Sequence, residues 1–470
     1  MARIIGIGAG AVGLGTAMLL ARDGHDVVVL ERDAPPPSAS ADEAWTTWQR
    51  RSVNQFRLPH FLLARTRKIL DTELPDVARA VEDEGGLRMN PLLQIPEEIR
   101  GSERPGDGEF ECLTARRPVF ESAFARVAEG TDGLDVRRGA AVESLVVDTA
   151  AARPTVIGVR TAEGDELRGD LVVDLGGRRS AMPNLLADAG LPTPVEELDD
   201  SGFMYFGRHF VSSDGSVPFA LGPGIMHLGT ITSLTLPADN GTWGLVIVTN
   251  AKDRALLGLR DPDRWETVFK SLPLVAHWLD GTPLEDGVVT ISKIEDRIRT
   301  YVVDGAPVAT GVVAVGDAWS CSNPSQGRGV SIGMLHGTVL RDTLRSAGLD
   351  DKDEFALAFH EATESTVRPW FEWTRSGDRH RLAEVDAMID GKPYKPDDPA
   401  FEMERALGAA ATLDPGCLRA GISATLVLTP LDESLRDAGL RARALELGAS
   451  WRDQPVLAPS RDELVAMATA

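Results

Sequence analysis

Apolar and polar positions near the start of the chain follow two different periods. Residues 4–7 form a short apolar run that leads into glycines, which predicts a buried parallel strand. Apolar residues then recur at helical spacing through residues 17–21, and Asp23-Gly24 is expected to end that helix. Residues 26–30 predict a second strand, so the order strand, helix, strand predicts a βαβ unit.

Other periods follow further along the chain. Turn signals divide residues 137–175 into short alternating runs, which predict a small meander whose last run, residues 171–175, is a return strand. Residues 89–110 are rich in Pro and Gly and are expected to form a loop. After residue 350 the helical period dominates, and it predicts helices over residues 354–376 and 379–389 followed by short amphipathic pieces.

A second, sheet-based lobe is predicted between about residues 200 and 298. Residues 203–211, 225–234 and 242–249 are rich in aromatic and β-branched residues, as strands are. Asn240-Gly241 lies between the last two of these runs and predicts a hairpin. A short helix over residues 263–271 is expected to follow.

Composition excludes several classes of partner. The length of 470 residues favours two or three lobes. The net charge of −22, with no basic stripe, argues against nucleic acid as a partner. No apolar run reaches the length of about 18 residues that a membrane span needs. Cys112, Cys321 and Cys417 lack a CxxC spacing, and the histidines lack a metal-ligand spacing, so we expect neither disulfides nor a metal site, and a cytoplasmic location.

The first glycine turn carries the pattern of a dinucleotide site. Gly8 permits a tight turn after the first strand, Gly10 lets the backbone approach a pyrophosphate, and Gly13 lets helix and strand pack closely. Ala11 and Val12 open the helix, whose N-terminal N–H groups and partial positive charge attract phosphates. The sequence therefore predicts that these five residues bind a dinucleotide.

An acidic residue stands at the tip of the second strand. Glu31 can accept hydrogen bonds from a ribose hydroxyl pair, and its charge would repel a 2′-phosphate, which disfavours NADP at this turn. We place Arg32 beside it in the same site. This turn alone does not separate NAD from FAD.

The stretch GVVAVGDAWSCSNPSQGRGVS, residues 311–331, predicts a second strand-to-helix turn. FAD is long, and one Rossmann turn holds only its adenosine and pyrophosphate, so its far end needs a separate anchor. We expect Gly316 and Asp317 to place a carboxylate against sugar-like hydroxyls. The following residues would bring another helix N-terminus to the flavin, and they are Pro324, Gly327, Arg328 and Gly329.

Three motifs together resemble the flavoprotein monooxygenases of the aromatic-hydroxylase (p-hydroxybenzoate hydroxylase-like) fold. GDAWSCSNPSQGRG is similar to their GDA…P…G-x-G motif, and ECLTARRPVFESAF to a signature in which an Arg, here Arg117, precedes a short helix. RRSVNQFRLPHFLLARTRKIL resembles a segment of actinomycete members, including epoxidases. The resemblance implies that Arg117 lies near the FAD pyrophosphate. The sequence leaves open whether Arg50 and Arg51 contact the FAD phosphates or carry surface charge.

The resemblance implies an FAD-dependent monooxygenase. Such an enzyme uses O2 and a C4a-hydroperoxyflavin to hydroxylate or epoxidise an apolar or aromatic small molecule, and the actinomycete relatives favour secondary metabolism. The Asp-Gly pair that many single-component hydroxylases carry is replaced by Asp174-Leu175-Gly176-Gly177-Arg178, similar to the D-x-x-G-R-x-S form of epoxidases and two-component enzymes. The electron source is therefore open between NADH, NADPH and a separate flavin reductase.

Catalytic residues stay unknown, because the oxygen chemistry belongs to the cofactor. Tyr205 and His209 share one face of a predicted strand, and Arg208 points away from it. That face is either a substrate pocket or a packed sheet face. His227 on the next strand, and Gln55 and His60 after the first βαβ unit, are the other pocket candidates.

Three alternatives remain. A flavin-dependent halogenase would carry a W-x-W-x-I-P motif and a catalytic Lys, and the motif is absent. A reductase of isoprenoid double bonds would carry an aromatic-rich substrate motif that we do not find. A non-catalytic FAD-binding interaction protein would keep the same FAD motifs, so the sequence does not separate it from an enzyme.

The predicted fold is α/β, with a discontinuous Rossmann-like FAD-binding domain, a mainly antiparallel substrate domain and a helical C-terminal region. The FAD-binding domain is assigned to residues 1–88, 112–190 and 300–345, the substrate domain to 89–111 and 191–299, and the helical region to 346–470.

Overall fold

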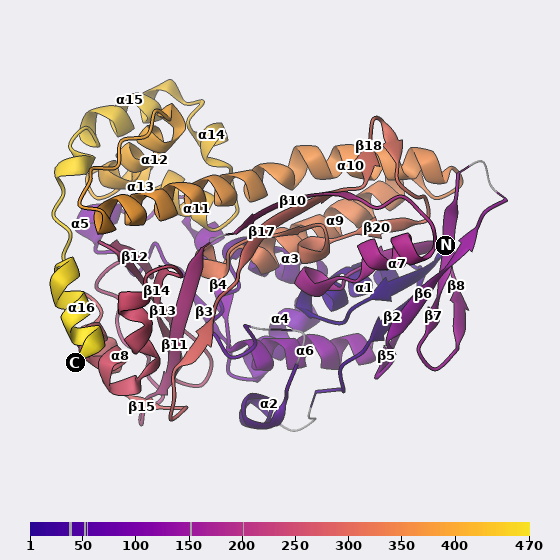
Figure 1. Ribbon diagram of the computed structural model, residues 1–470, viewed down its shortest axis with the longest axis horizontal. Helices are drawn as coiled ribbons and strands as arrows, with labels where there is room; N and C mark the ends of the chain where they lie inside the picture. Colours follow the sequence, from indigo (N-terminus) through magenta and orange to yellow (C-terminus); the bar gives the residue numbers. More distant parts are fainter. Residues whose placement is uncertain (37–39, 51–52, 54, 151–152, 201) are drawn as a thin grey trace.

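The computed structural model describes residues 1–36, 40–50, 53, 55–150, 153–200 and 202–470. Figure 1 shows a lobe built on a parallel sheet, a second lobe built on an antiparallel sheet, and helices that run along one side of both. The α/β fold with a parallel Rossmann-like sheet, an antiparallel sheet and C-terminal helices is confirmed.

The parallel sheet has five strands in the order β20-β9-β1-β2-β5. Its strands are β1 (Arg3–Ile7), β2 (Asp26–Glu31), β5 (Leu134–Arg138), β9 (Leu171–Asp174) and β20 (Val312–Ala314). Because all pairs are parallel, the strands end at one edge, and β1, β2, β9 and β20 each lead into a turn there. The chain segments that the sequence assigned to two nucleotide turns therefore meet at this edge.

Side chains alternate between the two faces of this sheet, as the strand period requires. Ile4 packs with the helices α1 (Ala11–Arg22), α6 (Arg117–Glu129) and α9 (Gly329–Ala347), whereas Ile5 packs with the other cover. That cover consists of the helix α7 (Met182–Asp188) and the predicted meander, which is β6 (Val142–Asp148), β7 (Thr155–Thr161) and β8 (Glu166–Arg168). Both faces are buried, which explains why the strands read as continuous apolar runs.

The second lobe has a six-stranded antiparallel sheet in the order β12-β13-β14-β11-β15, with β16 paired to β11. The strands are β11 (Phe203–Val211), β12 (Ile225–Leu228), β13 (Ile231–Pro237), β14 (Thr242–Asn250), β15 (Thr282–Pro283) and β16 (Val289–Ile291). The predicted hairpin is confirmed, because Asn240 and Gly241 have φ of 52° and 67° between β13 and β14. The single strand expected over residues 225–234 was wrong: Gly229, with φ of 62°, turns the chain and makes two strands.

Each face of this sheet has its own cover. One face packs against α8 (Pro262–Lys270) and the terminal helix α16 (Arg461–Thr469), with Leu464 and Ala468 in the shared core. The opposite face carries Tyr205 in a separate cluster with Leu58. The last helix of the chain is thus part of the second lobe's core.

The long helices beside both lobes break at a different place from the predicted one. They are α10 (Lys352–Thr366) and α11 (Arg368–Ile389), shown in Figure 1 running along one side of the molecule. The predicted break near Gly377 was wrong, since Gly377 lies inside α11. The break falls at Val367 because Pro369 has no N–H and starts a new helix.

Gly377 offers a direct check on this helix. A Cβ added there would meet nothing within 4 Å. We expect Gly377→Ala to raise the free energy of unfolding by about 0.5–1 kcal/mol, since Ala loses less backbone entropy than Gly in a helix. Urea denaturation measures the change. A decrease would show that residue 377 is not in a helix interior.

The remaining elements connect these parts. The helices are α2 (Ala41–Thr47), α3 (Ala64–Glu73), α4 (Pro75–Asp83), α5 (Glu97–Arg100), α12 (Pro399–Ala410), α13 (Pro415–Thr425), α14 (Leu431–Ser434) and α15 (Ala438–Leu447). The strands are β3 (Leu87–Met89), β4 (Cys112–Thr114), β10 (Val195–Asp200), β17 (Glu295–Thr300), β18 (Val302–Val303), β19 (Ala306–Pro307) and β21 (Ser320–Cys321). The domain boundaries stay a prediction, and the loop over residues 89–111 contacts α3 and α13 through Arg67 and Arg419.

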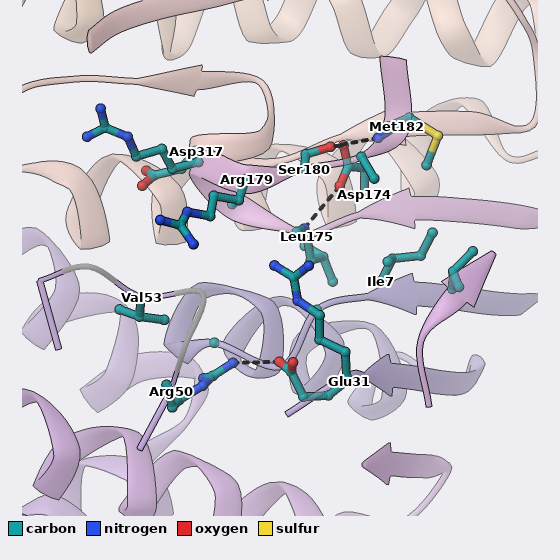
Figure 2. A pocket seen from close by; sticks show the side chains of 18 of the residues that line it. Ile7, Glu31, Arg50, Val53, Asp174, Leu175, Arg179, Ser180, Met182 and Asp317 are labelled. Carbon is teal, nitrogen blue, oxygen red and sulfur yellow. Dashed lines mark hydrogen bonds and ion pairs between the residues drawn. The ribbon is translucent and has the colours of Figure 1, made fainter. Parts of the chain in front are cut away.

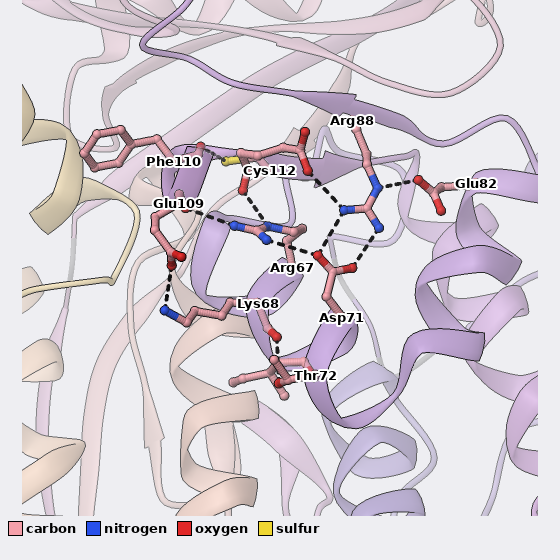
Figure 3. Close-up of polar contacts among 11 residues, drawn as sticks. Arg67, Lys68, Asp71, Thr72, Glu82, Arg88, Glu109, Phe110 and Cys112 are labelled. Atoms are coloured by element: carbon pink, nitrogen blue, oxygen red, sulfur yellow. Dashed lines mark hydrogen bonds and ion pairs between the residues drawn. The ribbon is translucent and has the colours of Figure 1, made fainter. Parts of the chain in front are cut away.

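An arginine network joins α3, α4 and the β3-β4 ribbon (Figure 3). Arg88 of β3 lies 2.7 Å from Asp71 and 3.1 Å from Glu111, and it also pairs with Glu82. Asp71 also accepts a hydrogen bond from Arg67 at 3.0 Å. Asp71 thus holds two arginines, one from α3 and one from β3.

Candidate functional site

A cavity of about 230 Å³ runs along the carboxyl edge of the parallel sheet (Figure 2). Its wall includes the first turn, the ends of β2 and β9, and residue 317 of the second turn, so both predicted turns line one space. The cavity also reaches the segment after β16 in the second lobe. The polar and glycine lining comprises Gly8, Gly10, Glu31, Arg32, Arg50, Gln55, Arg117, Asp174, Gly176, Gly177, Arg178, Arg179, Ser180, Ser292 and Asp317.

The glycines of the first turn act as the spacing predicts. A Cβ on Gly8, which has φ of 115°, would lie 2.4 Å from the Leu175 carbonyl oxygen. A Cβ on Gly13 would lie 2.4 Å from the Gly8 carbonyl oxygen, so this glycine permits the close packing of helix and strand. Gly10 lines the cavity and has no atom within 4 Å of an added Cβ, which leaves room for a ligand against the backbone.

Helix α1 points its N-terminus at this space. Gly10 is its N-cap, and the first intrahelical bond runs from the Leu14 N–H to the Gly10 carbonyl at 2.8 Å. The N–H groups of Ala11, Val12 and Gly13 therefore have no acceptor within their own helix. Because the first turn carries no acidic residue, the positive end of the helix dipole is available to an anion.

Glu31 is buried and holds the first turn together. It accepts hydrogen bonds from the backbone N–H of Ala9 at 2.8 Å and of Asp33 at 3.0 Å. Arg50 donates to it at 2.5 Å, and Figure 2 shows the two side chains facing each other. Arg50 is only 6% exposed and lines the cavity, so it is not a surface charge. Arg51 lies outside the described residues.

Arg117 enters the cavity from the start of α6. Its Nε donates to Glu121 at 2.6 Å, and its Nη1 donates to His60 Nε2 at 3.0 Å. His60 Nδ1 lies 2.8 Å from the Leu58 carbonyl oxygen, which fixes the neutral tautomer that can accept from Arg117. Burial, with the charge of Arg117, lowers the pKa of His60 to about 3.

Asp317 follows the end of β20 in the short helix η5 (Gly316–Ala318). Its carboxylate lines the cavity, and none of the residues that the structure describes donates a hydrogen bond to it. Burial raises its pKa above the ordinary value, and Arg117, Arg178 and Arg297 oppose the rise. The backbone N–H of Gly316 donates to His336 Nδ1 at 3.2 Å, which holds the turn from α9.

The substituted Asp-Gly segment forms the middle of the wall. Asp174 Oδ1 accepts from the Gly176 N–H at 3.0 Å, and Oδ2 accepts from the Ser180 hydroxyl at 2.5 Å. Ser180 Oγ in turn accepts from the Met182 N–H at 3.1 Å (Figure 2). The D-x-x-G-R-x-S pattern is therefore a hydrogen-bonded turn that presents Arg178 and Arg179 at the cavity.

Several candidates of the second turn lie elsewhere. Pro324, Gly327, Arg328 and Gly329 are not among the residues that line the cavity. The Arg328 guanidinium lies 3.6 Å from the centre of the Trp373 ring and donates to Thr374 at 3.1 Å, so it points toward α11. The start of α9 therefore reaches the C-terminal helices, and a flavin contact by these four residues stays a prediction.

One of the substrate-pocket candidates lines the cavity, and the others are not among its lining residues. Gln55 lines the cavity, whereas His227 is exposed on β12 and lies 2.9 Å from Thr232 Oγ1. Tyr205 is buried with its hydroxyl on Asn323, and His209 packs against Trp45 at 4.6 Å and lies 3.2 Å from Glu285. As predicted, Arg208 points to the opposite face, where it pairs with Glu266 at 2.7 Å.

The donor set fits a dinucleotide such as FAD. Gly10 leaves a cradle beside a helix N-terminus, five arginines line the same cavity, and Asp317 offers at the far turn an acceptor that receives no hydrogen bond from the described residues. Glu121 was missed from the sequence, because its contact with Arg50 is set by the tertiary fold. Within the described ranges no cluster of three potential metal ligands is found, and no helix is long and apolar enough to cross a membrane.

Comparisons with known proteins agree with this geometry. Residues 3–103 match the family model described as FAD dependent oxidoreductase. Protein Rv3254 of Mycobacterium tuberculosis is 26% identical over 408 residues, which cover 80% of this chain and 81% of that protein.

Solved structures share the fold. PqsL of Pseudomonas aeruginosa, a probable FAD-dependent monooxygenase that has also been solved with 2-aminobenzoylacetate, superposes with a TM-score of 0.56 at 18% identity over 83% of this chain and 97% of PqsL. The Diels-Alderase PyrE3 of pyrroindomycin biosynthesis superposes with a TM-score of 0.54 at 18% identity over 83% of this chain and 76% of PyrE3. Residues 3–103 are thus similar to FAD-dependent oxidoreductases, and the fold of the chain is shared with PqsL and PyrE3.

Proposed function

We propose that the chain is a monooxygenase that inserts one atom of O2 into an apolar or aromatic small molecule, by hydroxylation or epoxidation. The observation that carries the proposal is the single cavity that both glycine turns line and that continues to the second lobe beyond β16. PqsL, which shares the fold, has been solved with the aromatic compound 2-aminobenzoylacetate, and this supports the aromatic class of substrate. Electrons come from NADH, NADPH or a separate flavin reductase.

When bound, FAD supplies the reduction and activation of O2. The chain's own residues bind and orient it: the α1 N-terminus and Arg117 receive the anionic part, and Asp317 accepts from hydroxyl groups at the far turn. The second lobe contributes the apolar side chains of Ile291 and Ile294 to the cavity wall, which disfavours water there.

A buried carboxyl pair beside the second turn can hold a proton. Asn323 donates from Nδ2 to Asp378 Oδ1 and from its backbone N–H to Asp296 Oδ1, each at 2.8 Å. Burial raises the pKa of both carboxyls. Asp378 Oδ2 has no hydrogen-bond partner among the described residues, so it is the oxygen of this pair that is left to take up a proton.

The test uses the purified protein loaded with FAD and reduced without oxygen. It is then mixed with ¹⁸O2 and a panel of apolar arenes and alkenes that includes 2-aminobenzoylacetate. We expect one ¹⁸O atom in a product detected by mass spectrometry. Release of one H2O2 per reduced flavin with every compound would contradict the proposal.

PyrE3 shows that the fold is also found in a Diels-Alderase. A cyclase on this scaffold would convert a polyene without consuming O2, whereas the proposed activity requires it. The same panel under argon therefore separates the two functions, and product formation without O2 would favour the cyclase.

A further inference from the structure

Glu121 is a buried acid that the proposed chemistry does not use. It lies one helical turn after Arg117 in α6, and its side chain is 1% exposed. Oε1 accepts from Arg117 Nε at 2.6 Å, and Oε2 accepts from Arg50 Nη1 at 2.7 Å. One carboxylate thus holds both of these cavity-lining arginines, which come from distant parts of the sequence.

The network extends from Glu121 to the first turn. Arg50 Nη1 also donates to the Ala9 carbonyl at 3.1 Å, and Arg50 Nη2 donates to Glu31. Ala9 itself donates to Glu31 at 2.8 Å. The position of Arg50 relative to the glycine turn is therefore fixed from two sides.

Arg117 keeps donors for a ligand. Its Nε and Nη1 are engaged by Glu121 and His60, while Nη2 has no hydrogen-bond partner among the residues that the structure describes. Because Arg117 lines the cavity, Nη2 is the part of the fork left for an anion. If the Arg117 guanidinium rotated away from Glu121, its Nη2 would leave the position in which it is available to an anion.

The negative charge of Glu121 is unexpected beside a site for an anion. Burial alone would raise its pKa, but the charges and hydrogen bonds of Arg117 and Arg50 hold the pKa below the ordinary value, so the carboxylate is ionised. A negative charge beside a site for an anionic diphosphate opposes binding by simple electrostatics. Its presence there is explained if orientation of the arginines outweighs the repulsion.

We propose that Glu121 is a positioning residue that fixes Arg50 and Arg117 as the cationic pair for the diphosphate of the FAD dinucleotide. Glu121 acts through the two guanidinium groups and does not itself touch the cofactor. The inference rests on FAD binding in the cavity.

The experiment measures equilibrium binding of FAD, ADP and riboflavin to the flavin-free full chain. For Glu121→Gln we expect about ten-fold weaker binding of FAD and ADP, the scale of one charge-assisted hydrogen bond. Riboflavin, which lacks the diphosphate, should bind unchanged. Electrostatics without positioning predicts the opposite sign, since the variant removes a negative charge, so unchanged or tighter FAD binding overturns the inference.

Two further variants complete the design. Asp71→Asn is the matched control, because Asp71 also holds two arginines but lies outside the cavity wall (Figure 3). It should leave all three affinities unchanged, and a loss equal to that of Glu121→Gln would assign the effect to general destabilisation. Glu121→Asp keeps the charge and serves if Glu121→Gln does not fold, since the shorter side chain cannot reach both arginines and should also weaken FAD binding. If the wild-type chain binds riboflavin and FAD equally, the FAD assignment fails before this inference is tested.

Discussion

Asp317→Ala is expected to bind FAD about 100-fold more weakly than the wild-type chain, which corresponds to about 3 kcal/mol. The Asp317 carboxylate lines the cavity and receives no hydrogen bond from the described residues, so its acceptor capacity is left for the cofactor. Hydrogen bonds to a charged acceptor contribute about 1.5–3 kcal/mol each. Since none of the described residues donates to Asp317, the substitution leaves none of their donors unpaired, and the fold should be kept.

The measurement is the FAD dissociation constant by fluorescence titration, with circular dichroism and thermal unfolding as checks of the fold. Asp317→Asn keeps an acceptor oxygen of the same shape but loses the charge, so it should bind with intermediate affinity. Asp353→Ala removes a half-exposed carboxylate that pairs with Arg153, and neither residue is among those that line the cavity, so it should not change FAD binding. Full flavin occupancy in Asp317→Ala would exclude Asp317 as an anchor of the far end.

Local signals in the sequence were enough to locate both turns. The role of Gly13 follows from the strand and helix on either side of it, because any side chain there would collide with the Gly8 carbonyl. Asp317 follows from its place after a buried strand, since parallel strands end at one edge of the sheet. Such features depend on residues near each other in the chain, and for that reason the amino-acid sequence alone is enough to predict them.

Residues whose roles depend on tertiary contacts were not found. Glu121 reads as an ordinary position on an amphipathic helix, and only the fold brings Arg50, from another segment, within 2.7 Å of it. Arg50 itself was open between ligand contact and surface charge, because its sequence neighbours give no information on burial. Arg328 sits in a glycine-rich motif that predicts a cofactor contact, yet its side chain packs on Trp373.

Errors in the element boundaries have a common cause. The prediction ended a helix at Ser376, directly before Gly377, and missed the turn at Gly229. Glycine permits a turn but does not require one, and the difference is decided by packing of the flanking residues. Pro369 was the stronger signal for a helix start, because a missing N–H and a fixed φ cannot be compensated inside a helix.

The stability that two buried histidines contribute is expected to fall steeply on acidification, because their rings do not readily accept a proton in the folded state. His336 Nδ1 accepts from the Gly316 N–H at 3.2 Å, which leaves its Nε2–H to donate to Thr363 at 3.1 Å. His60 likewise accepts from Arg117 through Nε2. Burial lowers the pKa of each ring to about 3, with Arg117 adding to the effect at His60.

The direction of this pH dependence follows from the lowered pKa of each histidine in the folded state. Each histidine contributes its full stability above the unfolded-state pKa of about 6.5, and that contribution is lost progressively as the pH falls toward about 3. Between about pH 7 and pH 5 the loss is about 2 kcal/mol for each histidine and about 4 kcal/mol for the pair. Carboxyls with raised pKa, such as Asp378, act in the opposite direction. The total pH dependence of the wild-type chain therefore mixes both groups.

Replacement of each histidine by glutamine isolates the contribution of that histidine to the pH dependence of the free energy of unfolding. Glutamine keeps polar atoms at the site but does not titrate, so the free energy of unfolding of His336→Gln should fall by about 2 kcal/mol less than that of the wild type between about pH 7 and pH 5. His60→Gln should behave alike, and the double variant should lose both shares, since the two rings contact different partners. Urea denaturation at the two pH values gives these differences, and the value near pH 7 corrects for lost packing. Equal pH dependence in His336→Gln and the wild type would mean that His336 takes up a proton as readily in the folded chain as in the unfolded chain, so burial and the Gly316 N–H would not hold its ring neutral.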